Sequence, residues 1–441
     1  MRRLLMLAFV LAMVTGPEAF AQSTTAIQGQ VTSASGDPVA GATVRASLIR
    51  FQEGRRRAVD AGLSATTDDH GRYRIDGLAA GRYLVRAAAP PDGAVQPADV
   101  RFVPLFAPQP AEPKEILLEA GHRIDLDLTT TPLPTARISG RMLNSAGRPM
   151  TTSLLIEPSH RSGAVTPPAM GGTILPDGRF EFANVPPGEY AVQIFRTRPN
   201  PSTEGEFAGA YVRVSGADVT GVELKTSVGS TIRGTLAFAN DEPIPQGRFV
   251  ITPARADLDQ TPFLGAELAQ GEVQNDLTFE IRGLHGPRRL LLAQAPAGWI
   301  LKAVRAKGQD VTDLPLVFGT EDESLDDAEI IVTSRVAGLS GSVVDDRGQR
   351  VTRYSLLAFP VDRALWYPAS RFFRRAVPDT EGRFQIAAMT PGEYYIAAVS
   401  PFDEQDDSWQ DPDSLEGIAV RATRMVASEA TKLSVTIRLL R

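Results

Sequence analysis

The sequence predicts an all-β protein built from four tandem β-sandwiches, and three observations carry this prediction. One motif recurs along the chain with its two glycines at a constant spacing. A second motif, rich in glycine and β-branched residues, precedes each copy of the first. Apolar and polar side chains alternate beside these glycines, which is the period of a strand that buries one face.

The downstream motif is present in three clear copies and one degraded copy. The clear copies read HGRYRIDGLAAGRYLVRAA from His70, DGRFEFANVPPGEYAVQIF from Asp177 and EGRFQIAAMTPGEYYIAAV from Glu381. The two glycines are ten residues apart in each copy: Gly71 and Gly81, Gly178 and Gly188, Gly382 and Gly392. In the degraded copy, DLTFEIRGLHGPRRLLLAQ, we expect Leu277 and Pro287 to take the places of the two glycines. A pattern that recurs in this way is typical of a fold that recurs.

The upstream motif sets the length of the repeat. It begins at Ile27, Ile138, Ile232 and Leu339, with sequences such as IQGQVTSASGDPVAGATV and LSGSVVDDRGQRVTRYSL. Successive copies start 111, 94 and 107 residues apart, which is the size of a domain. We therefore expect a signal peptide at 1–21 and sandwiches at 22–135, 136–230, 231–337 and 338–441, the third of which is degenerate.

The local chemistry predicts strands joined by tight turns. Phe384 and Ile386 alternate with polar neighbours, and Tyr394 belongs to a second alternating run. Between two such runs, TPGE and PPGE place Pro before Gly, the order that a type II turn prefers. A helix is expected in DPDSLEGIAVRA, where Asp411 can cap it and Pro412 can take its first position.

The N-terminal residues have the pattern of a secretory signal peptide. Arg2 and Arg3 precede an apolar run from Leu4 to Val14, and Ala19-Phe20-Ala21 offers small residues for cleavage after Ala21. No apolar stretch approaches the ~20 residues that a membrane-spanning helix needs. We expect an exported protein, periplasmic or at the cell surface, without a membrane span. Because the chain has no cysteine, apolar cores rather than disulfides must hold its domains.

Together the two motifs resemble the carboxypeptidase regulatory-like domain, a small β-sandwich of the transthyretin-like and Ig-like kind. The match is strong in the first copy, from Gly29 to Val44 and from Asp68 to Tyr83. The segment GWILKAVRAKGQDVTDLPL, from Gly298, is similar to multi-repeat exported proteins of bacteria. The resemblance implies a fold, and it implies glycan binding only as a property of similar sandwiches. It implies no catalysis, because this domain lies beside the catalytic domain in zinc carboxypeptidases.

The residues themselves favour no enzymatic chemistry. None of the four histidines is followed three residues later by the glutamate that a zinc carboxypeptidase needs. The sequence lacks a G-x-S-x-G elbow, a phosphate-binding loop and a dinucleotide motif. We expect no catalytic, metal-binding or cofactor-binding residues, and no cofactor. The net charge of −6 argues against a nucleic-acid partner.

Pairs of acidic residues at glycine turns allow two interpretations. Asp68-Asp69 and Asp345-Asp346 are examples. Their side chains can hydrogen-bond the turn backbone, or they can bind calcium. Hydrogen bonding to the turn backbone is the more common role of aspartate beside glycine. Calcium binding stays open as the alternative.

One stretch is a candidate ligand surface. RALWYPASRFFRR, from Arg363 to Arg375, interleaves aromatic residues with arginines in the long connection of the fourth copy. Aromatic faces stack on sugar rings and arginine pairs with carboxylates, so an acidic glycan or peptide can bind here. The alternative is packing between domains, or docking onto the acidic stretch DEQDDSWQDPD from Asp403. The candidate residues are Arg363, Trp366, Tyr367, Arg371, Phe372 and Arg374.

A second basic stretch lies in the long connection of the first copy. Arg55-Arg56-Arg57 is expected to be a solvated loop tip. The whole pattern predicts a non-catalytic exported protein that binds a glycan, a peptide or another envelope protein at the bacterial cell envelope. The alternative is a structural or adhesive stalk that spaces partners without a small-molecule ligand, and an uncommon hydrolase comes third.

Overall fold

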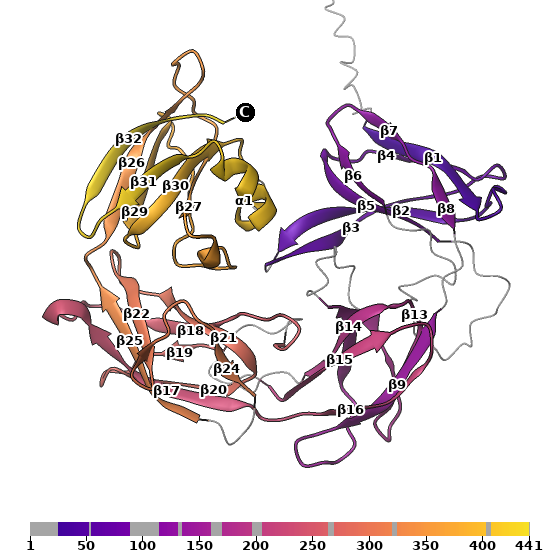
Figure 1. The fold of residues 1–441 in the computed structure, drawn as a ribbon, viewed down its shortest axis with the longest axis horizontal. Coiled ribbons are helices and arrows are strands. Elements are labelled where there is room, and N and C mark those ends of the chain that lie inside the picture. Colours follow the sequence, from indigo (N-terminus) through magenta and orange to yellow (C-terminus); the bar gives the residue numbers. More distant parts are fainter. Residues whose placement is uncertain are drawn as a thin grey trace, which may run out of the picture.

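The computed structural model describes residues 25–52, 54–88, 114–130, 135–159, 170–195, 205–262, 269–319, 324–402 and 407–440. The predicted signal peptide lies outside these residues. The described residues form β-sheets that pack in pairs around apolar cores, which confirms the all-β fold of tandem sandwiches (Figure 1). In this part of the chain, no helix has the length and apolar character to cross a membrane.

The first sandwich packs the sheet β4-β1-β7, to which β8 adds beside β1, against the sheet β3-β2-β5-β6. Its first strand runs antiparallel to β4 and parallel to β7 and β8. The strands are β1 (Ala26–Ser33), β2 (Thr43–Gln52), β3 (Arg55–Thr66), β4 (Arg72–Asp76), β5 (Gly81–Ala88), β6 (Lys114–Leu118), β7 (Arg123–Asp125) and β8 (Leu128–Thr130).

The second sandwich repeats this plan with the sheets β12-β13-β9-β16 and β11-β10-β14-β15. Its last strand, β16, again runs parallel to its first strand, β9. The strands are β9 (Ala136–Leu143), β10 (Ser153–Pro158), β11 (Met170–Gly171), β12 (Thr173–Ile174), β13 (Arg179–Val185), β14 (Gly188–Phe195), β15 (Phe207–Val214) and β16 (Val219–Lys225).

The third sandwich has the sheets β20-β17-β25-β22-β23 and β19-β18-β21-β24. Its first sheet has one strand more than the corresponding sheet of the second sandwich. A 3-10 turn, η2 (Ala239–Asp241), follows the first strand. The strands are β17 (Ser230–Phe238), β18 (Val250–Arg255), β19 (Gly271–Glu272), β20 (Thr278–Leu284), β21 (Gly286–Gln294), β22 (Ile300–Ala306), β23 (Gln309–Asp310), β24 (Leu316–Phe318) and β25 (Ser324–Thr333).

The fourth sandwich has the sheets β29-β26-β32 and β28-β27-β30-β31. It also carries the predicted helix α1 (Pro412–Ala419), which is confirmed with Asp411 as its cap. Two 3-10 turns, η3 (Arg363–Leu365) and η4 (Ser408–Gln410), lie in its long connections. The strands are β26 (Ala337–Val344), β27 (Ser355–Pro360), β28 (Arg374–Ala376), β29 (Arg383–Met389), β30 (Gly392–Val399), β31 (Thr423–Ala427) and β32 (Lys432–Arg438).

A glycine and an aromatic residue face each other across the first antiparallel strand pair of every sandwich. Each aromatic ring is at most 5% exposed, as the alternation in the sequence predicted. A Cβ atom on each glycine would lie only 1.9–2.0 Å from a carbonyl oxygen of the neighbouring parallel segment. The upstream glycine is therefore required by the close approach of two backbones. The pairs are Gly29 and Tyr73, Gly140 and Phe180, Gly234 and Phe279, and Gly341 and Phe384.

The first glycine of the downstream motif supplies a left-handed backbone. Gly71, Gly178 and Gly382 have φ of +71°, +81° and +74°. In the degraded third copy Leu277 adopts φ of +66°, so it does take the place of this glycine and keeps the turn at the cost of steric strain. The repeat therefore preserves backbone shape even where it has lost the residue best suited to that shape.

The prediction for the second glycine of the third copy was wrong by one residue. Gly286, and not Pro287, begins β21 and pairs with the neighbouring strand, as Gly81, Gly188 and Gly392 do in the other copies. The turn before this strand is one residue shorter than in the other copies, which spacing alone could not reveal. Arg288 consequently takes the position that Tyr83, Tyr190 and Tyr394 occupy elsewhere, two residues after the glycine.

That position bonds a backbone carbonyl of the preceding turn in every sandwich. The tyrosine hydroxyls donate to carbonyls four residues earlier, at 3.0, 2.9 and 2.6 Å. Buried Arg288 donates instead from Nε to the carbonyl of His285 at 2.8 Å.

The prediction of type II turns before these strands is wrong. A type II turn needs a positive φ at its glycine, and Gly188 and Gly392 are absent from the positive-φ residues of the described chain. In the second copy the left-handed residue is Asn184, four residues before Gly188.

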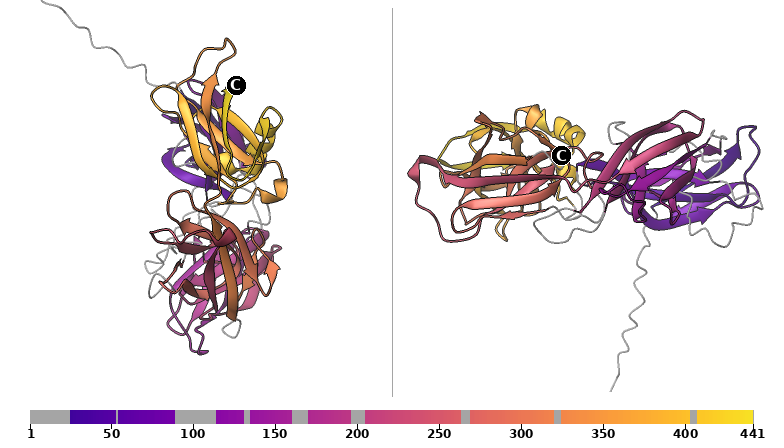
Figure 2. Two further views of the ribbon diagram at one scale, coloured as in Figure 1. Left: turned by 90° about the vertical axis from the view of Figure 1, so that its left-hand side faces the viewer. Right: turned by 90° about the horizontal axis from the view of Figure 1, so that it is seen from below.

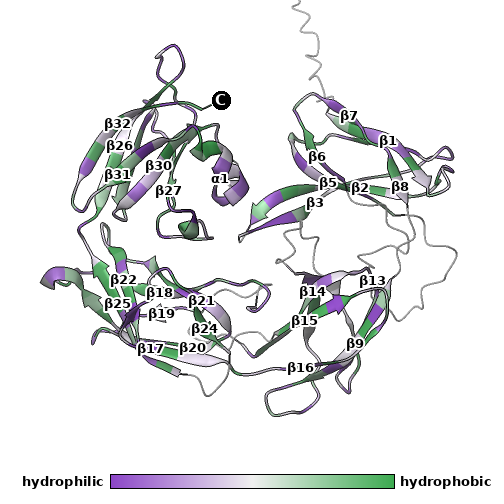
Figure 3. Cartoon of the chain, in the orientation of Figure 1, coloured by the Kyte–Doolittle hydropathy of each residue, from purple (hydrophilic) through white to green (hydrophobic). Residues whose placement is uncertain are grey.

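The four sandwiches follow one another around a ring, so that the first and the fourth become neighbours (Figure 1). Seen from the side, the ring is a flat layer (Figure 2). The strands of all four units carry both apolar and polar residues (Figure 3). The repeat therefore accounts for four cores, whereas the ring must depend on contacts between them.

The hairpin of β2 and β3 reaches the centre of the ring and contacts two other sandwiches. Arg55 pairs with Glu157 of β10 at 2.5 Å, and both side chains are at least 94% buried. Arg56 pairs with Asp411 at 3.0 Å and with Asp413 at 2.6 Å, which joins the first sandwich to the fourth. The expectation that these arginines form a solvated loop tip is wrong, because the hairpin extends beyond its own core and lies against its neighbours.

The seam between the second and third sandwiches is also polar and buried. Ser159 lies 2.5 Å from Asp259, and the Gln193 side chain donates to the carbonyls of Leu258 and Asp259. His285 is buried against Phe207, and burial lowers the pKa of its imidazole to about 4. The neighbouring Arg288 guanidinium contributes to this lowering, so the imidazole is neutral at physiological pH.

Candidate binding cleft between the third and fourth sandwiches

The fourth sandwich carries two long connections that include helical turns and a short α-helix. They contain η3, η4 and α1, and they cover the outer face of β27. All six residues of β27 are buried, because one face packs in the sandwich core and the other under these connections. The predicted ligand surface lies in the first of the two connections. The residues of the predicted ligand surface therefore lie in a connection that packs against β27, and not in a free loop.

Arg363 and Trp366 lie at the edge of this region. The Arg363 side chain is 68% exposed and forms an ion pair with Glu416 of α1. Trp366 is half-buried, its indole N–H donates to the carbonyl of Pro360 at 2.7 Å, and its ring packs edge-on against Phe359. Both side chains thus hold the connection to its own sandwich.

Tyr367 and Arg371 hold the connection to the third sandwich through one carboxylate. The Tyr367 hydroxyl donates to Asp313 at 2.8 Å, and Arg371 donates to both oxygens of Asp313 at 3.0 Å. The Arg289 guanidinium lies 4.0 Å from the centre of the Tyr367 ring. A two-point bond between arginine and carboxylate fixes orientation as well as distance. Asp313 therefore positions this loop of the fourth sandwich against the third.

Phe372 and Arg374 complete the predicted set. Phe372 is 8% exposed and packs in the core of the fourth sandwich beside Tyr394. Arg374 donates from Nε to the carbonyl of Ala388 at 2.9 Å, and from Nη1 to the carbonyls of Arg371 and Phe373 at 2.9 and 2.8 Å. Burial lowers the pKa of Arg374 below the ordinary range of arginine.

A cleft of about 610 Å³ opens between the third and fourth sandwiches where these elements meet. The third sandwich contributes the end of β21, the loop to β22 and Trp299. The fourth contributes residues 369–371, 373 and 374, with Thr390, Trp409 and Gln410. Arg371 and Arg374 of the predicted surface line this cleft. Arg363, Trp366, Tyr367 and Phe372 are not among its lining residues.

The backbone of this cleft contains one strained residue. Ala369 has φ of +59°, and its N–H donates to the side chain of Gln410 at 3.2 Å. A residue other than glycine rarely adopts this conformation, and such strain persists only where the surroundings impose it. The contacts of the neighbouring Arg371 with Asp313 and Leu301 supply that constraint.

The sequence did not single out three residues of the cleft. Trp299 lies in the segment that resembles exported multi-repeat proteins, and its ring packs edge-on against Phe238 and Phe249. Trp409 and Gln410 lie in the acidic stretch from Asp403. The many aspartates of this stretch led to an interpretation by charge, so the tryptophan was not predicted as a binding residue. Trp409 packs against Phe373 at 6.2 Å, so part of the expected docking between the two stretches is present. Asp403 itself lies outside the described residues.

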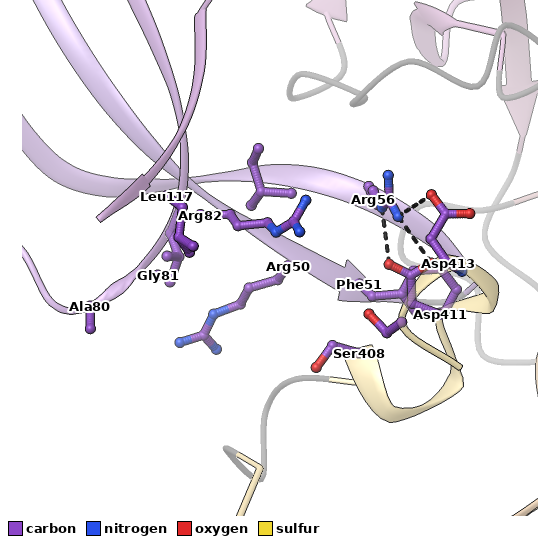
Figure 4. Close-up of a pocket in the computed structure, with 13 residues that line it drawn as sticks. Arg50, Phe51, Arg56, Ala80, Gly81, Arg82, Leu117, Ser408, Asp411 and Asp413 are labelled. Carbon is purple, nitrogen blue, oxygen red and sulfur yellow. Dashed lines mark hydrogen bonds and ion pairs between the residues drawn. The ribbon is translucent and has the colours of Figure 1, made fainter. Parts of the chain in front are cut away.

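A second cleft, of about 520 Å³, lies between the first and fourth sandwiches (Figure 4). Arg50, Arg82 and Leu117 line one side, and the start of α1 lines the other. The ion pairs of Arg56 with Asp411 and Asp413 close one end, as the dashed lines show. This cleft mixes basic and acidic walls, so its lining favours no single ligand charge.

The aspartates at the glycine turns bond the backbone, as the first of the two interpretations predicted. Asp68 accepts from the N–H groups of His70 and Arg72, and Asp345 accepts from those of Arg347 and Gln349. These bonds lower the pKa of Asp68. Within the described ranges, no cluster of three or more histidine, aspartate or glutamate side chains is arranged to hold a metal ion.

The first repeat matches a known domain family. Residues 26–102 match the carboxypeptidase regulatory-like domain family. This match confirms the resemblance for the first repeat, and it covers less than a fifth of the chain. The search of curated proteins found no match.

Several solved structures are similar in part. The TIE protein of Bacillus anthracis is 10% identical, with 94% of this chain and 73% of that chain covered and a TM-score of 0.19. The major pilin subunit of Bacillus cereus is 12% identical, with 70% and 99% covered and a TM-score of 0.18. The minor pilin of Streptococcus agalactiae is 12% identical, with 51% and 100% covered and a TM-score of 0.21. Scores this low carry no argument about function.

Proposed function

We propose that this chain is a non-catalytic binding protein of the bacterial cell envelope, and that it recognises a glycan or a peptide in the cleft between its third and fourth sandwiches. One observation carries the proposal: two of the chain's three tryptophans and two arginines line the same cleft. Tryptophan offers a flat apolar face with a polar edge, and arginine offers directed hydrogen bonds. Such a mixture of aromatic and polar groups is typical of ligand sites at domain junctions.

Export and the absence of catalysis rest on the sequence. The pattern at residues 1–21 favours export, and the motifs of the common hydrolases are missing. The closed ring also weighs against a simple stalk, since a spacer is most effective when its ends are far apart. Here the first and fourth sandwiches are joined by the Arg56 ion pairs.

The proposal is tested with glycan and peptide arrays probed with the purified protein, followed by Trp409→Ala and Trp366→Ala. Saturable binding that is lost in Trp409→Ala and kept in Trp366→Ala would support the cleft. Binding lost only in Trp366→Ala would move the site to the predicted surface outside the cleft. Silence of a folded protein on both arrays would contradict the proposal and favour the stalk.

A further inference from the structure

The charge of the cleft between the third and fourth sandwiches differs from that of the protein as a whole. The chain carries a net charge of −6, with 52 acidic residues. Among the described residues that line this cleft, none is aspartate or glutamate, whereas Arg371 and Arg374 are both present. An acidic protein thus presents a cleft wall without acidic groups.

The two arginines are not equivalent. Arg371 is neutralised by the two-point bond with Asp313. Arg374 donates only to backbone carbonyls, and no carboxylate of the described residues pairs with it. Carbonyl groups satisfy hydrogen bonds but do not cancel a charge, and a half-buried cation without a counter-ion is costly. The cleft therefore has one positive charge that nothing in the described chain balances.

The geometry leaves part of Arg374 available to a ligand. Its Nε and Nη1 atoms are occupied by the carbonyls of Ala388, Arg371 and Phe373, which lock the guanidinium in place. The remaining nitrogen, Nη2, belongs to a side chain that lines the cleft. A guanidinium held in this way loses little conformational entropy on binding an anion, so it is preorganised.

The other lining groups match a sugar. Trp409 is half-buried at the cleft and offers ring surface to the apolar face of a pyranose. The amide of Gln410 accepts from Ala369 through its oxygen, which leaves its NH₂ group as a donor. Exposed Gln294 adds a further donor and a further acceptor to the same lining. Two amide side chains beside an aromatic ring suit a ligand that carries many hydroxyl groups.

We infer that the cleft binds an acidic saccharide, a chain of uronic-acid sugars, with a sugar carboxylate on Arg374 Nη2 and a sugar ring on Trp409. This inference rests on the proposed function and narrows it to one ligand class. The Arg374 contact supplies the selection for charge, and the tryptophan supplies affinity for the ring. Neutral sugars of the same shape lose the first contact and keep the second.

The test measures binding of a matched panel by calorimetry. The probes are oligosaccharides of glucuronic, galacturonic, mannuronic and guluronic acid, each with its carboxyl-reduced neutral counterpart. At least one acidic probe should bind tenfold or more tightly than its neutral counterpart, and its affinity should fall as salt rises. This comparison uses the unmodified protein, so it does not depend on any variant folding.

Two arginine variants place the contact. Arg374→Gln should abolish the preference for the acidic probe, whereas Arg375→Gln should keep it, because Arg375 donates to Phe402 and does not line the cleft. Equal binding of acidic and neutral probes, lost in Trp409→Ala, would overturn the inference and leave the proposed function standing. Binding of acidic peptides without any saccharide would also overturn it. A preference for acidic probes that survives Arg374→Gln would place the charge contact elsewhere and contradict the assignment.

Discussion

The interiors of the four sandwiches and the seams between them are built on different principles. Each interior repeats the same pair, a glycine opposite an aromatic ring, as in Gly341 and Phe384. The seams repeat nothing: one depends on Arg55 and Glu157, another on Asp313. Apolar packing in the cores is tolerant of sequence as long as pattern and size are kept. Contacts between unlike surfaces are specific to one place, so the repeat predicts the cores and does not predict the seams.

The largest expected effect separates one core from the others. Phe384→Ala removes a ring that is 3% exposed, and it should lower the free energy of unfolding of the fourth sandwich by ~3–5 kcal/mol. That is a large part of the ~5–15 kcal/mol that stabilises a domain. Limited proteolysis should then cut beyond about residue 337 and leave the first three sandwiches. If the whole chain became sensitive at once, the four cores would behave as one unit.

Removal of a buried charge at a seam should have an effect of similar size. Glu157→Ala removes the buried carboxylate that pairs with the buried Arg55 side chain, which costs about 3–5 kcal/mol. Chemical denaturation of the variant should show this loss. The matched control is Glu181→Ala, whose partner Arg137 is exposed and 3.8 Å away, and which should cost about 1 kcal/mol or less. Equal losses in both variants would show that the central pair is not buried in solution.

Acidification should weaken the seam between the second and third sandwiches. The imidazole of His285 has its pKa lowered from about 6.5 to about 4, so the unfolded chain binds its proton at a higher pH than the folded chain. Above about pH 6.5 the imidazole is neutral in both the folded and the unfolded chain. As the pH falls from 6.5 toward 4, the free energy of unfolding should therefore decrease by roughly 3 kcal/mol. Thermal unfolding between pH 7 and 4 should show this slope, and His285→Gln should flatten it. A variant with an unchanged slope would show that other groups cause it.

The fold could be predicted from the sequence because its signals are local. Strand alternation, the left-handed glycines and the Asp411 cap each depend on a few neighbouring residues. The site could be predicted only in part: Arg371 and Arg374 were in the predicted surface, whereas Trp299 comes from another sandwich. Residues that meet across a seam are far apart in the chain, and their contact depends on how whole sandwiches lie. The Arg55–Arg57 stretch was misjudged for the same reason.

The smallest expected effect concerns the ion pairs that join the first and fourth sandwiches. Arg56 is 29% exposed and Asp413 is 68% exposed, so solvent screens much of their attraction. Arg56→Ala should cost about 1 kcal/mol or less and lower the melting temperature by a few degrees at most. Differential scanning calorimetry in low and high salt measures this. A loss of several kcal/mol would mean that this contact is as important as the buried seam at Glu157.

The central claim is that contacts outside the repeat close the four sandwiches into a ring, and one distance measurement tests it directly. The chain has no cysteine, so spin labels can be placed at Leu117→Cys in the first sandwich and Val420→Cys in the fourth, both exposed positions. Pulsed electron double resonance should give one narrow distance distribution, and Glu157→Ala should broaden it. A broad distribution in the unmodified background would contradict the closed ring and favour sandwiches that move independently on their linkers.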